Sequence, residues 1–292
     1  MSFKDLKKNS SDFSKLQSEL EKQNKTNDYK DDRMWRPVLD AASNGYAVIR
    51  FLPAVQGEDI PWVKTYQHAF RGKGGWFINN CPTTLGQKCP VCEGNSELWA
   101  SGTESDKNIA RDRKRKLTYT SNILIIEDPA SPQNKGKVFL FKYGKKIFDK
   151  IQEQMNPEFA DESTVNPFDF WKGANFKLKV RKVEGYVNYD KSEFSAASAV
   201  FDGDDAKIEA LWNSQYPLKP FVDPKEFKSY AELKVKLVDA LGGDLRNEAG
   251  EEDTFESDTK VRQTTSRRSA PKQKTEDADI DVDTYLKSLG DE

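Results

Sequence analysis

The chain of 292 residues places its only histidine and all three of its cysteines between positions 68 and 92. These residues are His68, Cys81, Cys89 and Cys92. Zn²⁺ prefers four tetrahedral ligands drawn from thiolate and imidazole, and a Cys-x-x-Cys turn brings two thiolates within reach of one ion. A catalytic zinc ion keeps one position open for water, whereas four protein ligands close the site. The cluster therefore predicts one structural Zn²⁺ per chain.

A redox pair and accidental buried cysteines are the alternatives for this cluster. Cys89 and Cys92 have the spacing of a thioredoxin-like pair. That interpretation leaves His68 and Cys81 without a role, and no helix is evident that would open at Cys89 after a strand. Three cysteines cannot all pair within one chain, so a secreted disulfide framework is not expected.

A hairpin would bring two of the ligands together. The run RGKGG at 71–75 is a glycine-rich reversal, so the strands on its two sides would carry His68 and Cys81. Other runs rich in β-branched or aromatic residues are bounded by Gly, Pro, Asn or Asp, which predicts strands. These runs are 46–52, 117–126, 137–143 and 175–183.

Two helices are indicated by apolar spacing and by capping residues. Ile147, Ile151 and Met155 recur at every fourth position, which places them on one face of a helix. Ser229 and Glu232 form a capping box at the start of a second helix, which ends at a glycine pair. The sequence therefore predicts a mixed β protein with helices.

The two ends of the chain differ in composition from its body. Residues 1–28 are polar with one short helical signal and predict an N-terminal basic arm, while residues 29–242 predict the core, with a zinc subdomain at about 62–100. Residues 243–292 carry 14 acidic and 8 basic residues without an apolar pattern, which predicts a flexible, disordered acidic tail. Subtracting them from the chain totals of 48 and 46 leaves a body with 34 acidic and 38 basic residues, a balance that suggests an anionic partner such as nucleic acid.

Membrane association is not indicated. No stretch approaches the roughly 18 apolar residues that a membrane span requires, and the N-terminus has no apolar run of signal-peptide length. We therefore expect a soluble protein of the cytosol with no membrane partner.

Three segments mix cations with aromatic residues: 111–123, 137–150, which contains Lys145 and Lys146, and 177–191. Single-stranded nucleic acid is held by this combination, because cations follow the phosphates while aromatic faces stack on unpaired bases. In the alternative interpretation, the charges lie on solvated strand faces and the aromatic residues belong to the core. Three such segments beside a zinc module and an acidic tail favour nucleic-acid binding.

An active site is not indicated. The tripeptide Gly-Asp-Asp at 203–205 is similar to a polymerase metal motif, but a helical pattern follows it at once, so Asp204 or Asp205 is more simply an N-cap. The segment also fails as an EF-hand loop, since it lacks the glycine and the glutamate that such a loop requires. With His68 assigned to the metal, no histidine is left for acid–base chemistry, and we expect that the protein is not an enzyme.

Several stretches of the chain match one protein family. They are NGYAVIRFLP, GGWFINNC, CPVC, KRKLTYTSNILIIEDPASPQNKGKVF, YGKKIFDKI, WKGANFKLKV and NYDKSEF, and they cover most of residues 40–195. The chain resembles the single-stranded DNA-binding proteins of T-even-type bacteriophages. The zinc pattern of that family, His-x12-Cys followed by Cys-x2-Cys, corresponds to His68, Cys81, Cys89 and Cys92.

The resemblance implies an OB-fold core, a zinc subdomain packed against it, and a DNA cleft between the two. The cleft aromatic residues that it implies are Trp76, Tyr119, Phe141, Tyr186 and Tyr189. The basic cluster that it implies is Lys114, Arg115 and Lys116. The residues that it implies for self-association of the arm along DNA are Lys7, Lys8, Ser10 and Ser11.

The resemblance also implies a function. We expect a sequence-tolerant, cooperative single-stranded DNA-binding protein that coats DNA during phage replication, recombination and repair, in the cytoplasm of the infected host. The acidic tail would recruit the phage DNA polymerase, helicase loader, primase and recombination mediator. A zinc-containing RNA-binding translational repressor is the alternative, and a nuclease or primase subunit is a third hypothesis.

Overall fold

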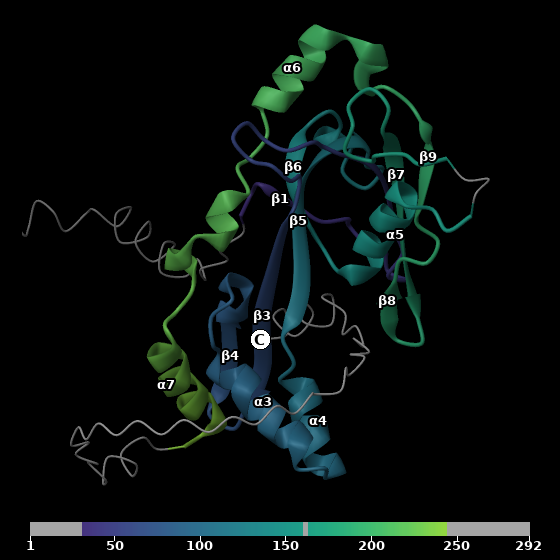
Figure 1. Ribbon diagram of the computed structural model, residues 1–292. Helices are drawn as coiled ribbons and strands as arrows, with labels where there is room; N and C mark the ends of the chain where they lie inside the picture. The colour runs from purple at the N-terminus through teal and green to yellow at the C-terminus, as the bar shows by residue number, and fades with distance from the viewer. Residues whose placement is uncertain (1–30, 160–162, 244–292) are drawn as a thin grey trace, which may run out of the picture. The chain divides into compact units, whose positions relative to one another are not determined.

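The computed structural model describes residues 31–159 and 163–243 (Figure 1). The predicted arm with Lys7, Lys8, Ser10 and Ser11, and the predicted tail beyond Gly243, lie outside the described residues. The chain divides into two units, one that ends at Met34 and one that begins at Trp35.

The described residues form an antiparallel sheet with helices, which confirms the predicted mixed β class with helices. The strands are β1 (Met34–Trp35), β2 (Gly45–Phe51), β3 (Val63–Gly72), β4 (Gly75–Asn80), β5 (Lys116–Glu127), β6 (Val138–Tyr143), β7 (Ala174–Val183), β8 (Tyr186–Asn188) and β9 (Glu193–Ala197). The helices are α3 (Pro90–Ala100), α4 (Glu104–Asp112), α5 (Lys145–Met155), α6 (Asp205–Asn213) and α7 (Tyr230–Leu241). Short 3₁₀ turns are η1 (Pro82–Leu85), η2 (Pro132–Asn134), η3 (Val200–Gly203), η4 (Lys219–Val222) and η5 (Pro224–Glu226). All four strands predicted from β-rich runs are present as β2, β5, β6 and β7.

Strand β5 links the sheet to the hairpin that carries two of the predicted metal ligands. Its first residues pair with β3, with Lys116 opposite Gln67 and Tyr119 opposite Lys64. From Tyr119 onward β5 also pairs with β6, and from Ile123 onward it pairs with β2. Strand β2 in turn pairs with β7, which pairs with β8 and β9. Figure 1 shows β3 and β5 side by side, so one strand contributes to both the sheet and the hairpin.

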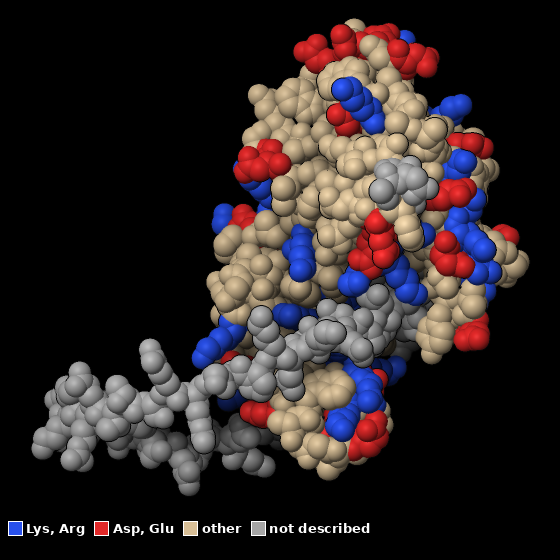
Figure 2. Space-filling model, turned by 45° about the vertical axis from the view of Figure 1, so that its right-hand side comes forward, with Lys and Arg blue, Asp and Glu red and all other residues tan. Residues whose placement is uncertain are grey.

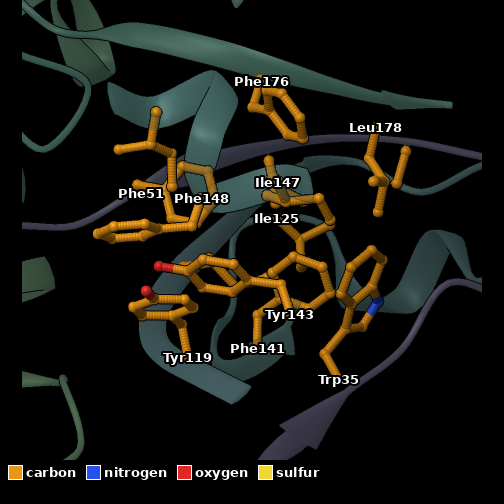
Figure 3. Close-up of a cluster of buried hydrophobic side chains, with 14 of the residues drawn as sticks. Trp35, Phe51, Tyr119, Ile125, Phe141, Tyr143, Ile147, Phe148, Phe176 and Leu178 are labelled. Atoms are coloured by element: carbon orange, nitrogen blue, oxygen red, sulfur yellow. The ribbon is translucent and has the colours of Figure 1, made fainter. Parts of the chain in front are cut away.

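The main apolar cluster is formed by the sheet and α5. Ile49, Phe51, Ile125 and Phe176 from the strands are fully buried, and Ile147 from α5 packs into the same cluster (Figure 3). Full burial of each such side chain stabilises the fold by roughly 1.5–3 kcal/mol. The predicted helix is confirmed as α5, whose apolar residues face the sheet.

A second apolar cluster includes the three cysteines of the predicted metal site. Phe70 and Phe77 of the β3–β4 hairpin stack with ring centroids 5.1 Å apart, and Leu233 and Ala240 of α7 pack into the same cluster. The capping box of α7 is present as predicted, between Ser229 and Glu232. Helix α7 therefore packs against the hairpin, although it lies far from it in the sequence.

Glycine is required where the hairpin turn meets the end of α7. The amide of Gly74 donates a hydrogen bond to the carbonyl of Ala240, at 2.9 Å. A Cβ atom at Gly74 would lie 1.9 Å from the carbonyl oxygen of Asp239, a distance that only backbone displacement could relieve. The glycine-rich reversal thus serves two purposes, since it turns the chain and admits the C-terminus of α7.

We expect Gly74→Ala to lower the free energy of unfolding by about 2 kcal/mol or more, because overpacking and backbone shifts commonly cost about 1–3 kcal/mol. Chemical denaturation followed by circular dichroism measures this loss. Gly94→Ala is the matched control, because a Cβ atom there has no neighbour within 4 Å. Since Gly94 lies inside α3, alanine should be neutral or stabilising by up to about 1 kcal/mol. Equal stability of the Gly74 variant and the original protein would contradict the close packing of α7.

Candidate metal centre and nucleic-acid interface

The four predicted metal ligands come together at the hairpin. The ligand atoms of His68, Cys81, Cys89 and Cys92 all lie within 4.8 Å of one another. The sulfurs of Cys81 and Cys92 are 3.6 Å apart, and His68 Nε2 lies 3.5 Å from the Cys89 sulfur and 3.4 Å from the Cys92 sulfur. Zn–S bonds of about 2.3 Å at tetrahedral corners would hold sulfurs about 3.8 Å apart. The four residues therefore fit a tetrahedral site and could hold a metal ion.

Three local structures position these ligands. His68 lies on β3, and Cys81 directly follows β4, so the predicted hairpin is confirmed. Cys89 is the N-cap of α3, and Cys92 lies in the first turn of that helix. A helix therefore opens at Cys89, which was not expected, although it follows the η1 turn and not a strand. Pro90 is the signal that would have indicated it, because proline favours the first helical position.

A Cys-x-x-Cys pair at a helix N-terminus is also the geometry of a redox pair. The convergence of His68 and Cys81 on Cys89 and Cys92 is what separates the two interpretations, because a redox pair requires neither. All three cysteines are free thiols. The positive end of the α3 dipole favours thiolates at this position, and thiolates are the form that binds metal.

Contacts within the cluster shift the pKa values of Cys81, Cys92 and His68. Hydrogen bonds with Cys89 and Cys92 lower the pKa of the Cys81 thiol, whereas hydrogen bonds with Cys81 and Cys89 raise the pKa of Cys92. Burial lowers the pKa of His68, but hydrogen bonds with Cys81 and Cys89, the charge of Cys81 and the hydrogen bond to the Arg113 backbone together outweigh burial and raise this pKa to about 9. A divalent cation would displace protons from its ligands on binding, because thiolate and neutral imidazole are the forms that bind metal.

A hydrogen bond fixes which nitrogen of the histidine faces the sulfurs. The Nδ1–H group of His68 donates to the carbonyl of Arg113, with 2.9 Å between the two atoms, which leaves Nε2 free to act as a ligand. Arg113 directly precedes the basic residues Lys114, Arg115 and Lys116. The metal cluster is thus attached to the start of the basic cluster.

One face of β3 runs from the sheet to the metal cluster. Because side chains alternate along a strand, Lys64, Tyr66 and His68 lie on the same face. Tyr119 of β5 lies opposite Lys64. The guanidinium carbon of Arg115 lies 4.1 Å from the centre of the Tyr66 ring, and the Lys64 ammonium lies 5.2 Å from it. We call Lys64, Tyr66 and Arg115 the basic–aromatic face, which ends where Tyr119 enters the core.

Lys64 and Tyr66 were not among the DNA-binding residues predicted from the sequence. The signal was present in the run VKTYQHAF, where Lys64, Tyr66 and His68 stand at alternate positions of one strand. A hydrogen bond with Tyr66 raises the pKa of Lys64, which keeps this lysine charged at neutral pH. The cation and the ring therefore form a stable pair beside the metal cluster.

The other predicted cations lie at the ends of elements. Lys114 and Arg115 lie between α4 and β5, Lys116 opens β5, and Lys145 and Lys146 open α5. Lys145 forms an ion pair of 2.9 Å with Asp149, and Lys146 is exposed. Their positions at element ends keep these side chains at the surface rather than in the core.

Charge is unevenly distributed over the surface. In Figure 2 acidic side chains gather at the top, where Figure 1 places α6, and the exposed acids there include Asp202, Asp204, Asp205 and Glu209. Asp204 is the N-cap of α6, as predicted. It does not belong to the group of potential metal ligands found among the described residues. Over the rest of the face in Figure 2, Lys and Arg side chains lie among Asp and Glu. An anionic ligand would therefore be repelled from the α6 end.

Two of the implied cleft aromatic residues lie in the core (Figure 3). Phe141 is 4% exposed and packs edge-on against Trp35. Tyr119 is 7% exposed, and its ring stacks on Phe148 with centroids 3.9 Å apart and 5° between the ring planes. Strand alternation points both rings to the inner side of the sheet. Their burial favours a packing role over the implied stacking on bases.

Trp76 is exposed but lies apart from the basic–aromatic face. It pairs with Arg71 across the hairpin, one position after the pair formed by Phe70 and Phe77. Because neighbouring pairs point to opposite faces, Trp76 lies on the face opposite to Phe70 and to Tyr66. The structure therefore does not bring Trp76 together with the other implied aromatic residues of the cleft.

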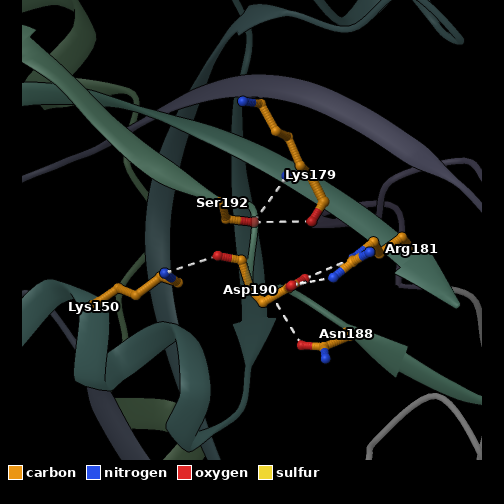
Figure 4. Close-up of polar contacts among 6 residues, drawn as sticks. All are labelled: Lys150, Lys179, Arg181, Asn188, Asp190 and Ser192. Carbon is orange, nitrogen blue, oxygen red and sulfur yellow. Dashed lines mark hydrogen bonds and ion pairs between the residues drawn. The ribbon is translucent and has the colours of Figure 1, made fainter. Parts of the chain in front are cut away.

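Tyr186 is the most exposed of the implied aromatic residues, with 66% of its surface accessible. It begins β8, directly after the turn that leads from β7. Figure 4 shows how the chain after β8 is held, since Asp190 pairs with Arg181 of β7 and its carbonyl accepts a hydrogen bond from Lys150 of α5. Tyr189 is partly buried against the main apolar cluster. These contacts hold the β7–β8 hairpin in place and leave the Tyr186 ring exposed.

A sheet with a basic–aromatic face beside a cysteine and histidine centre defines a class of nucleic-acid-binding proteins. Comparison of the chain with known protein families agrees with this class and makes it more specific. A family model described as gp32 DNA binding protein like matches residues 43–240, which is more than half of the chain. The chain belongs to this family.

Two relatives cover most of the chain. The single-stranded DNA-binding protein of Enterobacteria phage T2 is 38% identical over 214 residues, which are 71% of this chain and 70% of the relative. The protein of the same name from Enterobacteria phage T4 has the same identity and coverage. A shorter match, to the single-stranded DNA-binding protein of Escherichia phage SV14, is 46% identical over 61 residues, which are 20% of this chain and 54% of that protein.

Among the helices of the described residues, none is both long enough and apolar enough to span a membrane.

Proposed function

We infer that this protein binds single-stranded DNA in phage DNA replication, by a surface that includes the basic–aromatic face. The observation that carries the inference is the arrangement of Lys64, Tyr66 and Arg115 on one face beside the metal cluster. Cations along such a face can follow phosphates while a neighbouring ring stacks on a base, and neither contact reads sequence. Family membership and the names of the relatives support the same function.

We propose that the DNA contacts divide between two elements. Lys64, Tyr66, Arg115 and the neighbouring lysines of the basic cluster would hold phosphates near the metal centre. Tyr186 would offer its exposed ring for stacking from the β7–β8 hairpin. Tyr119 and Phe141 would support this surface from the core, and Tyr189 would anchor the hairpin. Lys145 and Lys146 would extend the cationic path to α5.

We propose that the metal is one structural Zn²⁺ per chain, held by His68, Cys81, Cys89 and Cys92. Support comes from the donor set, from spacings close to those of a tetrahedral Zn²⁺ site, and from the hydrogen bond that orients His68. The role of such an ion is to hold the hairpin and α3 together, because all four ligands come from these elements. No step of catalysis is assigned to it, and the protein is proposed to act as a DNA-binding protein and not as an enzyme.

We further propose an OB-fold core, which is supported by the antiparallel strands around one apolar cluster with α5 packed into it. The remaining parts of the proposal come from the sequence. Residues 1–28 would mediate cooperative self-association along DNA through Lys7, Lys8, Ser10 and Ser11. Residues 243–292 would recruit polymerase, helicase loader, primase and recombination mediator. The protein would act in the cytoplasm of the infected host.

Binding of oligo-dT, followed by intrinsic fluorescence over a salt series, tests the proposed function. We expect quenching of tryptophan and tyrosine emission and a linear fall of log K with log salt concentration, with a slope of roughly −0.7 for each phosphate contacted. Competition with a structured RNA of equal length separates this function from that of a translational repressor. Tighter binding of the RNA would contradict the proposal.

Lys64→Ala tests which face holds the DNA. We expect weaker oligo-dT binding and a slope reduced in magnitude by about 0.7, the change for one lost contact. Arg71→Ala is the matched control, since Arg71 is an exposed cation of the same strand that lies opposite Trp76 on the other face. If Arg71→Ala weakened binding and Lys64→Ala did not, the DNA would lie on the Trp76 face instead.

A further inference from the structure

Thr83 joins the metal cluster to the basic–aromatic face. Its Oγ1 atom lies 3.1 Å from the Cys81 sulfur, and Nη1 of Arg115 donates a hydrogen bond to the same oxygen at 2.5 Å. Arg115 in turn covers the ring of Tyr66, at 4.1 Å from its centre. A continuous set of contacts therefore runs from a metal ligand, through one hydroxyl group, to an arginine of the face.

The chemistry of the three groups sets the direction of these hydrogen bonds. Arginine can only donate, and a metal-bound cysteine sulfur is a thiolate that can only accept. A threonine hydroxyl has one proton and two lone pairs, so Thr83 can accept from Arg115 and donate to Cys81 at the same time. Hydrogen bonds with a charged partner are about twice as strong as neutral ones. Both contacts of Thr83 are of this kind.

The ring beneath Arg115 is held by the same turn. The amide of Cys81 donates to the carbonyl of Tyr66 at 2.8 Å, and the amide of Tyr66 donates to Oγ1 of Thr84 at 2.9 Å. Thr83 and Thr84 lie in η1, directly after the ligand Cys81. Both members of the Arg115–Tyr66 pair are thus attached to residues 81–84.

We propose that Thr83 is a positioning residue for DNA binding, which holds Arg115 over Tyr66 and at the same time stabilises the Cys81 thiolate on the metal. The proposal rests on the proposed function, in which Arg115 contacts a phosphate. Arg115 has a flexible side chain, and without the hydroxyl its guanidinium group would lose the partner that fixes its direction. Outer hydrogen-bond partners of metal ligands also commonly affect metal affinity.

Thr83→Val in the full-length protein removes the hydroxyl and keeps the side-chain shape. We expect about tenfold weaker oligo-dT binding, the scale of one charge-assisted hydrogen bond, with a salt slope reduced in magnitude by about 0.7. We also expect zinc extraction by a chelator, followed with a colorimetric zinc indicator, to be at least about tenfold faster. Thr83→Ser should restore both properties, because serine keeps the hydroxyl.

Thr65→Val is the control for the change from threonine to valine, since Thr65 lies on the opposite face of β3 and is only partly buried. It should leave both oligo-dT binding and zinc extraction unchanged. The Arg115→Ala variant separates two possible errors: that Thr83 does not position Arg115, and that Arg115 does not contact DNA at all. If Arg115→Ala binds oligo-dT normally, Arg115 does not contact DNA. If Arg115→Ala weakens binding and Thr83→Val does not, Arg115 needs no positioning by Thr83 and this proposal is wrong.

A further measurement tests the proposal even if Thr83→Val fails to fold. Arg115→Ala removes a partly buried surface side chain, so the fold should persist. Because Arg115 orients the Thr83 hydroxyl toward the Cys81 sulfur, its loss should make zinc extraction about threefold faster in the absence of DNA. An unchanged extraction rate in Arg115→Ala would overturn the proposed link between the arginine and the metal ligand.

Discussion

Cys89→Ser is expected to abolish stoichiometric zinc binding and to unfold the region around the hairpin at a lower temperature than the sheet. Structural Zn²⁺ contributes roughly 10–16 kcal/mol in zinc-finger peptides, which is comparable to the total stability of a typical domain, roughly 5–15 kcal/mol. Cys89 is 1% exposed and lies in the same apolar cluster as Phe77 and Leu233. Loss of the metal should therefore loosen α3 and α7 together with the hairpin.

Elemental analysis and differential scanning calorimetry measure this effect. The original protein should contain one zinc ion per chain and the Cys89→Ser variant much less, with an early second transition in the thermogram. Gly94→Ala, in the same helix, should keep its zinc, because the added Cβ has no close neighbour. Purified original protein with no zinc and three reactive thiols at full stability would rule out the structural metal site.

Tyr119→Ala and Tyr186→Ala are expected to have opposite effects. Tyr119 is buried and stacked on Phe148, so its truncation should cost about 3–5 kcal/mol of folding free energy, as for large aromatic residues in cores. Tyr186 is 66% exposed, so its truncation should leave stability unchanged. If its ring stacks on a base, the same truncation should weaken oligo-dT binding by about 1–3 kcal/mol.

Phenylalanine variants at the same positions are the controls. Tyr119→Phe keeps the stacked ring and should be nearly as stable as the original protein, and Tyr186→Phe keeps the exposed ring and should bind oligo-dT normally. Denaturant titration gives the stabilities, and fluorescence titration gives the affinities. A stable Tyr119→Ala variant with selectively weakened binding would show instead that Tyr119 stacks on DNA.

The sequence alone was sufficient to single out the four residues of the cluster and to predict most of the elements. His68, Cys81, Cys89 and Cys92 could be identified because the chain has no other histidine or cysteine, so no choice among candidates was needed. The strands and α5 could be predicted because their apolar spacing is a local property of the chain. The capping box of α7 is likewise a local signal, since Ser229 and Glu232 contact each other within one helical turn.

Only the tertiary structure decided which aromatic residues are buried. Tyr119 and Tyr186 look alike in the sequence, because each lies a few positions after a pair of basic residues or a longer basic run. Their difference comes from α5, which brings Phe148 against Tyr119 but leaves Tyr186 at the end of a hairpin. Such contacts join residues distant in sequence, and spacing within one segment carries no information about them.

The same reason explains why the contacts around the cysteine and histidine cluster could not be predicted from the sequence. The hydrogen bond between Arg115 and Thr83 spans 32 positions, and the contact of α7 with Gly74 joins segments more than 160 positions apart. Residue types and local periodicity determined that this protein has a cysteine and histidine cluster that could hold a metal ion, a β-rich core and cations beside aromatic residues. The pairing of β5 with β3 decided that this cluster and the cations share one surface, because only that pairing places Arg115 over Tyr66.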